Sequence, residues 1–191
     1  MDIGGALRGA PIADLALLVV LGVFFFLGVM QGSIRRLLGM GSMLFAFVIS
    51  ANLRDPVGRF FADNWRQFNQ DYNKLIAFVL VFVVLTVVCS IVIQGFYKRT
   101  EISARHPIVD DIVGGLLGLL QGFMLVLFAV IILNSSTLPT PRSGDLTQLR
   151  DLQTAIVSQS HIANWVRESI APVFVHILAI LLPDDLVKLF P

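Results

Sequence analysis

The stretch LIAFVLVFVVLTVVCSIVI, residues 75–93, contains no charged side chain. A helix rises about 1.5 Å per residue, so about 20 apolar residues are needed to cross the hydrocarbon core of a bilayer. The stretch therefore predicts a membrane-spanning helix, and the fold depends on how many other segments share this character.

Three further apolar runs occupy residues 15–30, 37–51 and 112–133, and only Gln121 interrupts the last. With their flanks, the four runs predict spans at about 12–31, 36–52, 75–94 and 112–133. The runs are continuous rather than alternating, which favours helices over the strands of a barrel. We therefore expect an all-α integral membrane bundle of four transmembrane helices, forming one domain over residues 1–135.

The composition supports a membrane protein. Apolar residues make up 56% of the chain and charged residues 14%, and the mean hydropathy is +0.82. A soluble domain carries about 25% charged residues, and a disordered chain has low hydrophobicity, so both classes are excluded. The net charge of +1 gives no field that would attract nucleic acid. Cys89 is the only cysteine, which excludes an intrachain disulfide.

The first two runs predict a helical hairpin with its break at Gln31-Gly32-Ser33. A single helix would be about 55 Å long. It would also bury Arg35 and Arg36, at about 2.5 to 3.5 kcal/mol each. The break places both arginines at the headgroups. A signal peptide is the alternative interpretation of the first run, but the region before Gly32 has no clear small-x-small cleavage site.

Residues 56–72 predict an amphipathic helix in the membrane interface. Asp55 and Pro56 resemble a helix start, and apolar residues then recur at spacings of three and four. This connector either caps the bundle between two spans or offers a platform to the membrane surface or a partner. The apolar positions are Val57, Phe60, Phe61, Trp65, Phe68 and Tyr72.

The chain after the fourth span divides into a linker, residues 136–148, and an amphipathic tail, residues 149–191. The linker is rich in Ser, Thr, Pro and Gly. Trp165 is the expected interface anchor of the tail. The apolar run at 173–182 is too short to span, so a surface-lying or half-inserted tail is expected. The apolar tail positions are Leu149, Leu152, Ile156, Ala163, Val166 and Ile170.

Glycines recur on one face of two predicted spans. Gly114, Gly118 and Gly122 fall at every fourth residue, and Gly28 and Gly32 form a second GxxxG pair. In lipid, close approach of backbones through small residues is a main source of helix packing energy. The pattern predicts a packing groove, whose partner helix lies either in this chain or in a second copy.

Few polar side chains stand near the spans. Asp14 precedes the first span and Asp110 the fourth. Each acid is expected to stabilise the N-terminus of its own helix, and a proton or ion relay is the alternative. Gln121 is a candidate interhelical hydrogen-bond donor. We expect no catalytic residue, metal site or cofactor, because no nucleophile, base and orienting group occur together, and the histidines lack metal-ligand spacing.

Two sequence blocks resemble the colicin V production protein family of small bacterial membrane proteins. The first comprises Asp14, Gly22 and Gln31-Gly32-Ser33-Ile34-Arg35-Arg36. The second runs from Asp110-Asp111 through Gly114, Gly118 and Gly122. The resemblance covers roughly residues 14 to 135, and Gln159-Ser160-His161-Ile162 resembles the family only loosely.

Three positions depart from the family pattern. Gln31 replaces a basic residue, Arg36 replaces a glutamate, and Asp111 replaces an arginine. If an arginine–acid pair joins the two blocks in the family, this chain has altered that pair.

The resemblance implies a four-helix, multi-pass inner-membrane protein connected with colicin V toxin production and envelope homeostasis. It also implies that the N- and C-termini face outward. The Lys and Arg residues alone leave the orientation open, with seven on the side of the termini and five on the other.

Two functions follow as hypotheses. The first is a non-enzymatic accessory protein that contacts the bilayer and either a second copy or a membrane or secretion partner. The second is a small transporter or pore component, suggested by the glycine-rich fourth span, Gln121 and the flanking acids.

Overall fold

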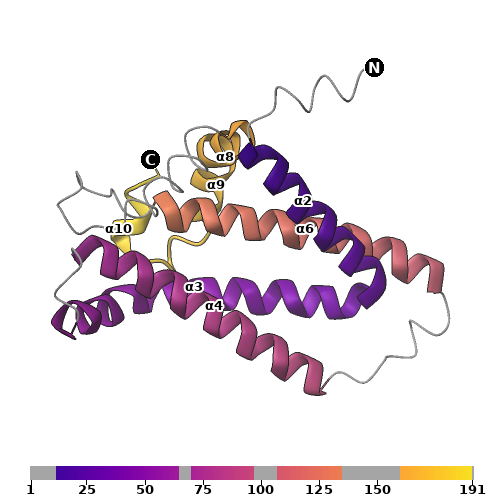
Figure 1. Cartoon of the computed structure of the whole chain (residues 1–191), viewed down its shortest axis with the longest axis horizontal. Helices are drawn as coiled ribbons and strands as arrows, with labels where there is room; N and C mark the ends of the chain where they lie inside the picture. Colours follow the sequence, from indigo (N-terminus) through magenta and orange to yellow (C-terminus); the bar gives the residue numbers. More distant parts are fainter. Residues whose placement is uncertain (1–11, 65–69, 97–106, 135–159, 191) are drawn as a thin grey trace.

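A computed structural model describes residues 12–64, 70–96, 107–134 and 160–190 of the chain (Figure 1). Every regular element in this part of the chain is helical, and no strand occurs in it. The long helices are α2 (Ile12–Gln31), α3 (Ser33–Asn64), α4 (Gln70–Phe96) and α6 (Pro107–Asn134). The shorter elements are α8 (His161–Trp165), the π-helical turn η2 (Val166–Ile170), α9 (Ala171–Ile177) and α10 (Asp184–Val187).

All four long helices are long and apolar enough to cross a membrane. They expose large apolar side chains on their outer faces, such as Phe26, Ile91 and Leu116, each more than 60% exposed. On α4 the exposed residues recur in pairs, beginning with Val79 and Leu80 and then Val83 and Val84. Such a continuous apolar exterior is stable in lipid and not in water. The predicted all-α membrane bundle is confirmed.

The helices form two tight antiparallel pairs, α2 with α6 and α3 with α4, which are joined mainly through contacts between α3 and α6. The direction of α2 against α6 follows from the glycines, since Gly28 approaches Gly114 whereas Phe24 approaches Gly118. In Figure 1, α2 crosses over α6 and α3 lies beside α4.

The predicted hairpin break is confirmed at Gly32, the single residue between α2 and α3. Gly32 has φ +78°, a left-handed conformation that residues with a Cβ rarely adopt. A Cβ there would also lie 2.5 Å from Asp110 Oδ2. Both the conformation and the space thus require glycine at this turn.

The connector differs from its prediction, because no separate helix begins at Pro56. α3 continues through Pro56 to Asn64. Proline removes one helical N–H donor and usually kinks or ends a helix, but in a membrane bundle neighbouring segments can compensate for the lost bond. In this region Asn52 Nδ2 donates to the Val48 carbonyl and to the Leu181 carbonyl, at 2.8 and 2.9 Å. Tyr72 belongs to α4 and is fully buried rather than part of an interfacial face.

The tail packs back onto the bundle, against α6 and the start of α2. Ala163, Val166, Ala171 and Val175 are fully buried and share one core with the long helices. Within residues 160–190, one apolar face of the tail therefore packs on the bundle, while Val173, Ile177 and Ile180 remain exposed. The linker at 136–148 and the start of the tail lie outside the described residues.

The core of the bundle is aromatic. Phe47 of α3 stacks on Phe128 of α6, with ring centroids 4.2 Å apart. Phe78 and Phe82 of α4 and Phe174 of α9 contact the Phe47 ring at their edges or at a tilt. The rings belong to three long helices and the tail, so the tail contributes one ring to the core of the bundle.

Candidate functional site

Asp110 connects the start of α6 to the start of α3. Its Oδ1 accepts hydrogen bonds from the Ser33 backbone N–H, at 2.9 Å, and from the Ser33 hydroxyl. The first N–H groups of a helix have no partner within the helix and carry its positive dipole end. The Asp110 carboxylate, 9% exposed, thus caps α3 from another helix.

Asp14 does the same for the tail. Its carboxylate accepts hydrogen bonds from the Ser160 hydroxyl and from the backbone N–H groups of His161 and Ile162, the latter two at 3.3 and 3.2 Å. The Ser160 hydroxyl oxygen in turn accepts the Ala163 N–H at 3.0 Å. Asp14 and Ser160 therefore cap α8 together, and both are buried.

The caps show partners that the sequence did not indicate. Both acids lie in the first turn of their own helices, as expected. They also accept hydrogen bonds from N–H groups of α3 and α8, which are 77 and at least 147 positions away. An acid at a helix start can face its own axis or a neighbouring helix, and only tertiary packing decides between them.

The five glycines predicted to pack helices, Gly28, Gly32, Gly114, Gly118 and Gly122, lie where α2 and α6 meet. A Cβ on Gly28 would stand 2.2 Å from the Gly114 carbonyl oxygen, and one on Gly118 would stand 2.3 Å from the Phe24 carbonyl oxygen. A Cβ on Gly122 would stand 2.9 Å from Phe24 Cβ. Real Cβ atoms essentially never approach other atoms so closely, so a side chain at any of these three positions would force the two helices to shift. The helix that fills this groove belongs to the same chain.

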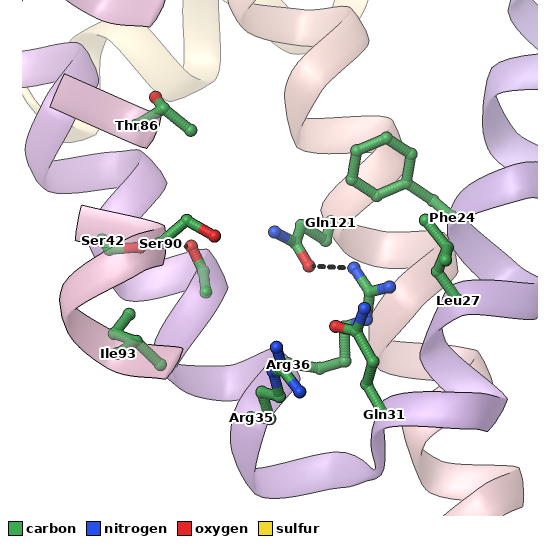
Figure 2. Close-up of a pocket in the computed structure, with 11 residues that line it drawn as sticks. Phe24, Leu27, Gln31, Arg35, Arg36, Ser42, Thr86, Ser90, Ile93 and Gln121 are labelled. Atoms are coloured by element: carbon green, nitrogen blue, oxygen red, sulfur yellow. Dashed lines mark hydrogen bonds between the residues drawn. The ribbon is translucent and has the colours of Figure 1, made fainter. Parts of the chain in front are cut away.

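Arg36 is buried between the helices of the bundle, and the sequence did not predict this burial. Its side chain is 5% exposed, NH1 donates to Gln121 Oε1 at 2.7 Å, and the guanidinium stands 5.7 Å from the centre of the Phe24 ring (Figure 2). Gln121 is thus an interhelical hydrogen-bonding residue, but it accepts rather than donates. Two hydrogen-bonded pairs therefore join the two family blocks: Arg36 with Gln121, and Ser33 with Asp110.

The remaining predicted residues have varied surroundings. Arg35 is half-buried, and together with Arg36 and Gln121 it lines a cavity between the helices. Nothing would lie within 4 Å of a Cβ on Gly22, so no close contact explains a glycine there. Phe60 is 64% exposed, and Trp165 is 54% exposed with its ring 6.3 Å from Phe123. Phe61 is half-buried, whereas Trp65 and Phe68 lie outside the described residues.

No role was predicted for three polar residues of the structure, Ser33, Ser160 and Thr86. Ser160 carried a usable signal, since serine directly before an apolar helix is a common N-cap. Ser33 follows a glycine break and has the same pattern. The position of Thr86 in the cavity wall could not be predicted, because a single threonine within an apolar span belongs to no recognisable motif.

Four spanning helices held by buried polar caps define a multi-pass integral membrane protein. The sequence matches the family model described as Colicin V production protein over residues 13–180, and the chain therefore belongs to this family. The match includes Ser160 and most of the tail, beyond the end of the resemblance at residue 135. It supports an accessory role in a membrane. No curated protein and no solved structure matches the chain significantly.

Proposed function

We propose that this chain is a non-enzymatic accessory protein of the inner membrane, acting in toxin (colicin V) production or export and in envelope homeostasis. One observation carries the proposal: Asp14 and Asp110, the acids of the two family blocks, each accept hydrogen bonds from the N-terminus of another helix. The acids of the two family blocks therefore hold helices of this chain together. This structural role supports a scaffold protein, whose function depends on the partner that it binds.

The surface available to a partner is the outer face of the tail. Trp165, Val173, Ile177 and Ile180 are all more than half exposed, and Ile180 is 97% exposed. The glycine faces of α2 and α6 are occupied by each other, and we propose that this GxxxG contact supplies much of the packing energy of the pair. A second copy of the chain would therefore have to use another surface.

Photo-crosslinking in native membranes tests the proposal. A photoreactive residue at Trp165 or Ile180 should yield an adduct with one identified membrane or secretion protein. The same residue at Val84, half exposed on α4, is the matched control and should yield lipid adducts. Lipid adducts alone at all three positions, together with full toxin secretion after Trp165→Ser and Ile180→Ser, would refute the accessory role.

The proposed orientation places both termini on the periplasmic side, as the family resemblance implies. That orientation puts Arg35 and Arg36 on the cytoplasmic side of the bundle, where Lys and Arg are generally enriched. Alkaline phosphatase fused after Pro191 should be active, and the same enzyme inserted after Gly32 should be inactive. The reverse pattern would contradict this orientation.

The alternative function, a small transporter or pore component, rests on the cavity beside Gln121. Flux of small ions into proteoliposomes that is lost in the Gln121→Leu variant would favour it. Flux equal to that of empty liposomes would end it.

A further inference from the structure

A cavity of about 260 Å³ lies between the two helix pairs. Figure 2 shows side chains from α2, α3, α4 and α6 around it. It is large enough for several water molecules or a small ion. Its polar lining includes Gln31, Arg35, Arg36, Thr86 and Gln121.

The charged side chains that line the cavity are all positive. Arg35 and Arg36 both line the cavity, and none of the described lining residues is acidic. Arg36 is 95% buried, since its exposed fraction is 5%. A buried cation without a counter-charge costs several kcal/mol, so such a group is normally paired.

The guanidinium of Arg36 is also only partly hydrogen-bonded. NH1 donates to Gln121, but Nε and NH2 are buried and have no hydrogen-bond partner. Gln121 therefore holds the guanidinium in place while other donors remain available. The planar guanidinium offers donors that match two oxygens of one phosphate or carboxylate.

Thr86 supplies a second free group from the opposite wall. Its Oγ1 is buried and has no partner, although a hydroxyl within a helix usually finds one. Thr86 comes from α4 and Arg36 from α3, so the two unpaired donors belong to different helices of the cavity wall (Figure 2). Two buried unpaired groups that line one cavity indicate a missing polar ligand.

We infer that this cavity binds a phosphate group, with Arg36 and Thr86 as its donors and Arg35 as a second positive charge. Arg36 lies one helical turn from the Gly32 break, at the level where a span reaches the headgroups. The phosphate therefore comes either from an anionic lipid or from a free phosphate ion. This inference does not depend on the proposed accessory role.

The test uses the full chain and two probes. In dodecyl maltoside micelles, the thermal unfolding midpoint is followed by tryptophan fluorescence while sodium phosphate is titrated against sodium chloride of equal ionic strength. In a second arm, nanodiscs of phosphatidylcholine are compared with nanodiscs that also contain phosphatidylglycerol. The wild-type midpoint should rise with at least one probe, because a ligand that binds only the folded state stabilises it.

The variants separate a specific site from a general charge effect. Arg36→Gln should weaken binding of the effective probe by about tenfold or more. Arg59→Gln removes the same charge from an exposed position of α3 and should leave binding within about twofold. Thr86→Val should weaken binding as well, but should raise the midpoint without ligand, because it removes an unpaired buried hydroxyl.

The outcomes are distinct. A response to sodium phosphate alone assigns a free ion, and a response to phosphatidylglycerol alone assigns a lipid. A wild type that responds to neither probe overturns the inference, as does an Arg36→Gln variant that responds fully. If Arg36→Gln does not fold, Thr86→Val decides: unchanged binding in that variant overturns the inference.

Discussion

The two ends of α2 are held by the same chemistry for different purposes. At its C-terminal end, Asp110 of α6 caps α3 beside the Gly32 turn. At its N-terminal end, Asp14 of α2 caps α8 of the tail. One cap fixes a turn between two spanning helices, and the other attaches a segment that does not span. We infer from this difference that the spans and the tail are assembled by separable contacts.

The end near Gly32 also depends on the contact of α2 with α6, and breaking that contact should have the largest effect. Gly28→Leu places a side chain where the Gly114 carbonyl oxygen lies 2.2 Å from the Cβ position. The helices must separate, so the free energy of unfolding should fall by about 3 kcal/mol or more. Titration of micelles with SDS measures it.

Gly22→Leu is the matched control on the same helix, since nothing lies within 4 Å of that Cβ position. Equal losses in the two variants would show that α2 and α6 do not pack through Gly28.

Removal of the Asp110 cap should have the next largest effect. Asp110→Ala leaves the Ser33 N–H and hydroxyl without their acceptor. Loss of an N-cap and of a partly buried hydrogen bond should lower the free energy of unfolding by about 2 kcal/mol. The same SDS titration measures this value. Wild-type stability would show that Asp110 does not hold the turn.

Removal of the Asp14 cap should act on the tail first. Asp14→Ala should cost about 1 to 2 kcal/mol by the same reasoning. It should also expose the bond after Arg167 to trypsin while the spanning helices stay folded. Mass spectrometry of the digest and the helical circular dichroism signal measure the two effects. A tail that resists trypsin as in the wild type would contradict a separable attachment.

A surface ion pair should matter least. Lys74 Nζ stands 3.1 Å from Asp55 Oδ1, and both side chains are about one-third exposed. Asp55→Ala should therefore change the free energy of unfolding by less than about 1 kcal/mol. A loss as large as that of Asp110→Ala would show that removal of any aspartate, and not of a cap, explains the earlier results.

The spans were predictable because an uncharged run of about 20 residues has few structures available to it. The Gly32 break was predictable for a similar reason, since two adjacent arginines cannot lie midway along a span at low cost. The Asp55-Pro56 pattern wrongly predicted the start of a new helix. The same pair can also lie inside a long helix when neighbouring segments compensate for the N–H donor that proline lacks.

The candidate site was predictable in its residues but not in its contacts. The glycines, Asp14, Asp110 and Gln121 all follow from their types and positions. Their partners depend on which helix lies opposite, and one sequence does not contain that information. The burial of Arg36 was missed for the same reason, since the cavity that surrounds it forms only when both helix pairs meet.

The most direct test of the account is a double-mutant cycle between Asp14 and Ser160. SDS titration would give the free energy of unfolding of the wild type, Asp14→Ala, Ser160→Ala and the double variant. The account predicts a coupling of about 1 kcal/mol or more, because the two residues form one buried cap. Losses that add within about 0.5 kcal/mol would show that the two residues act independently, and would contradict the account.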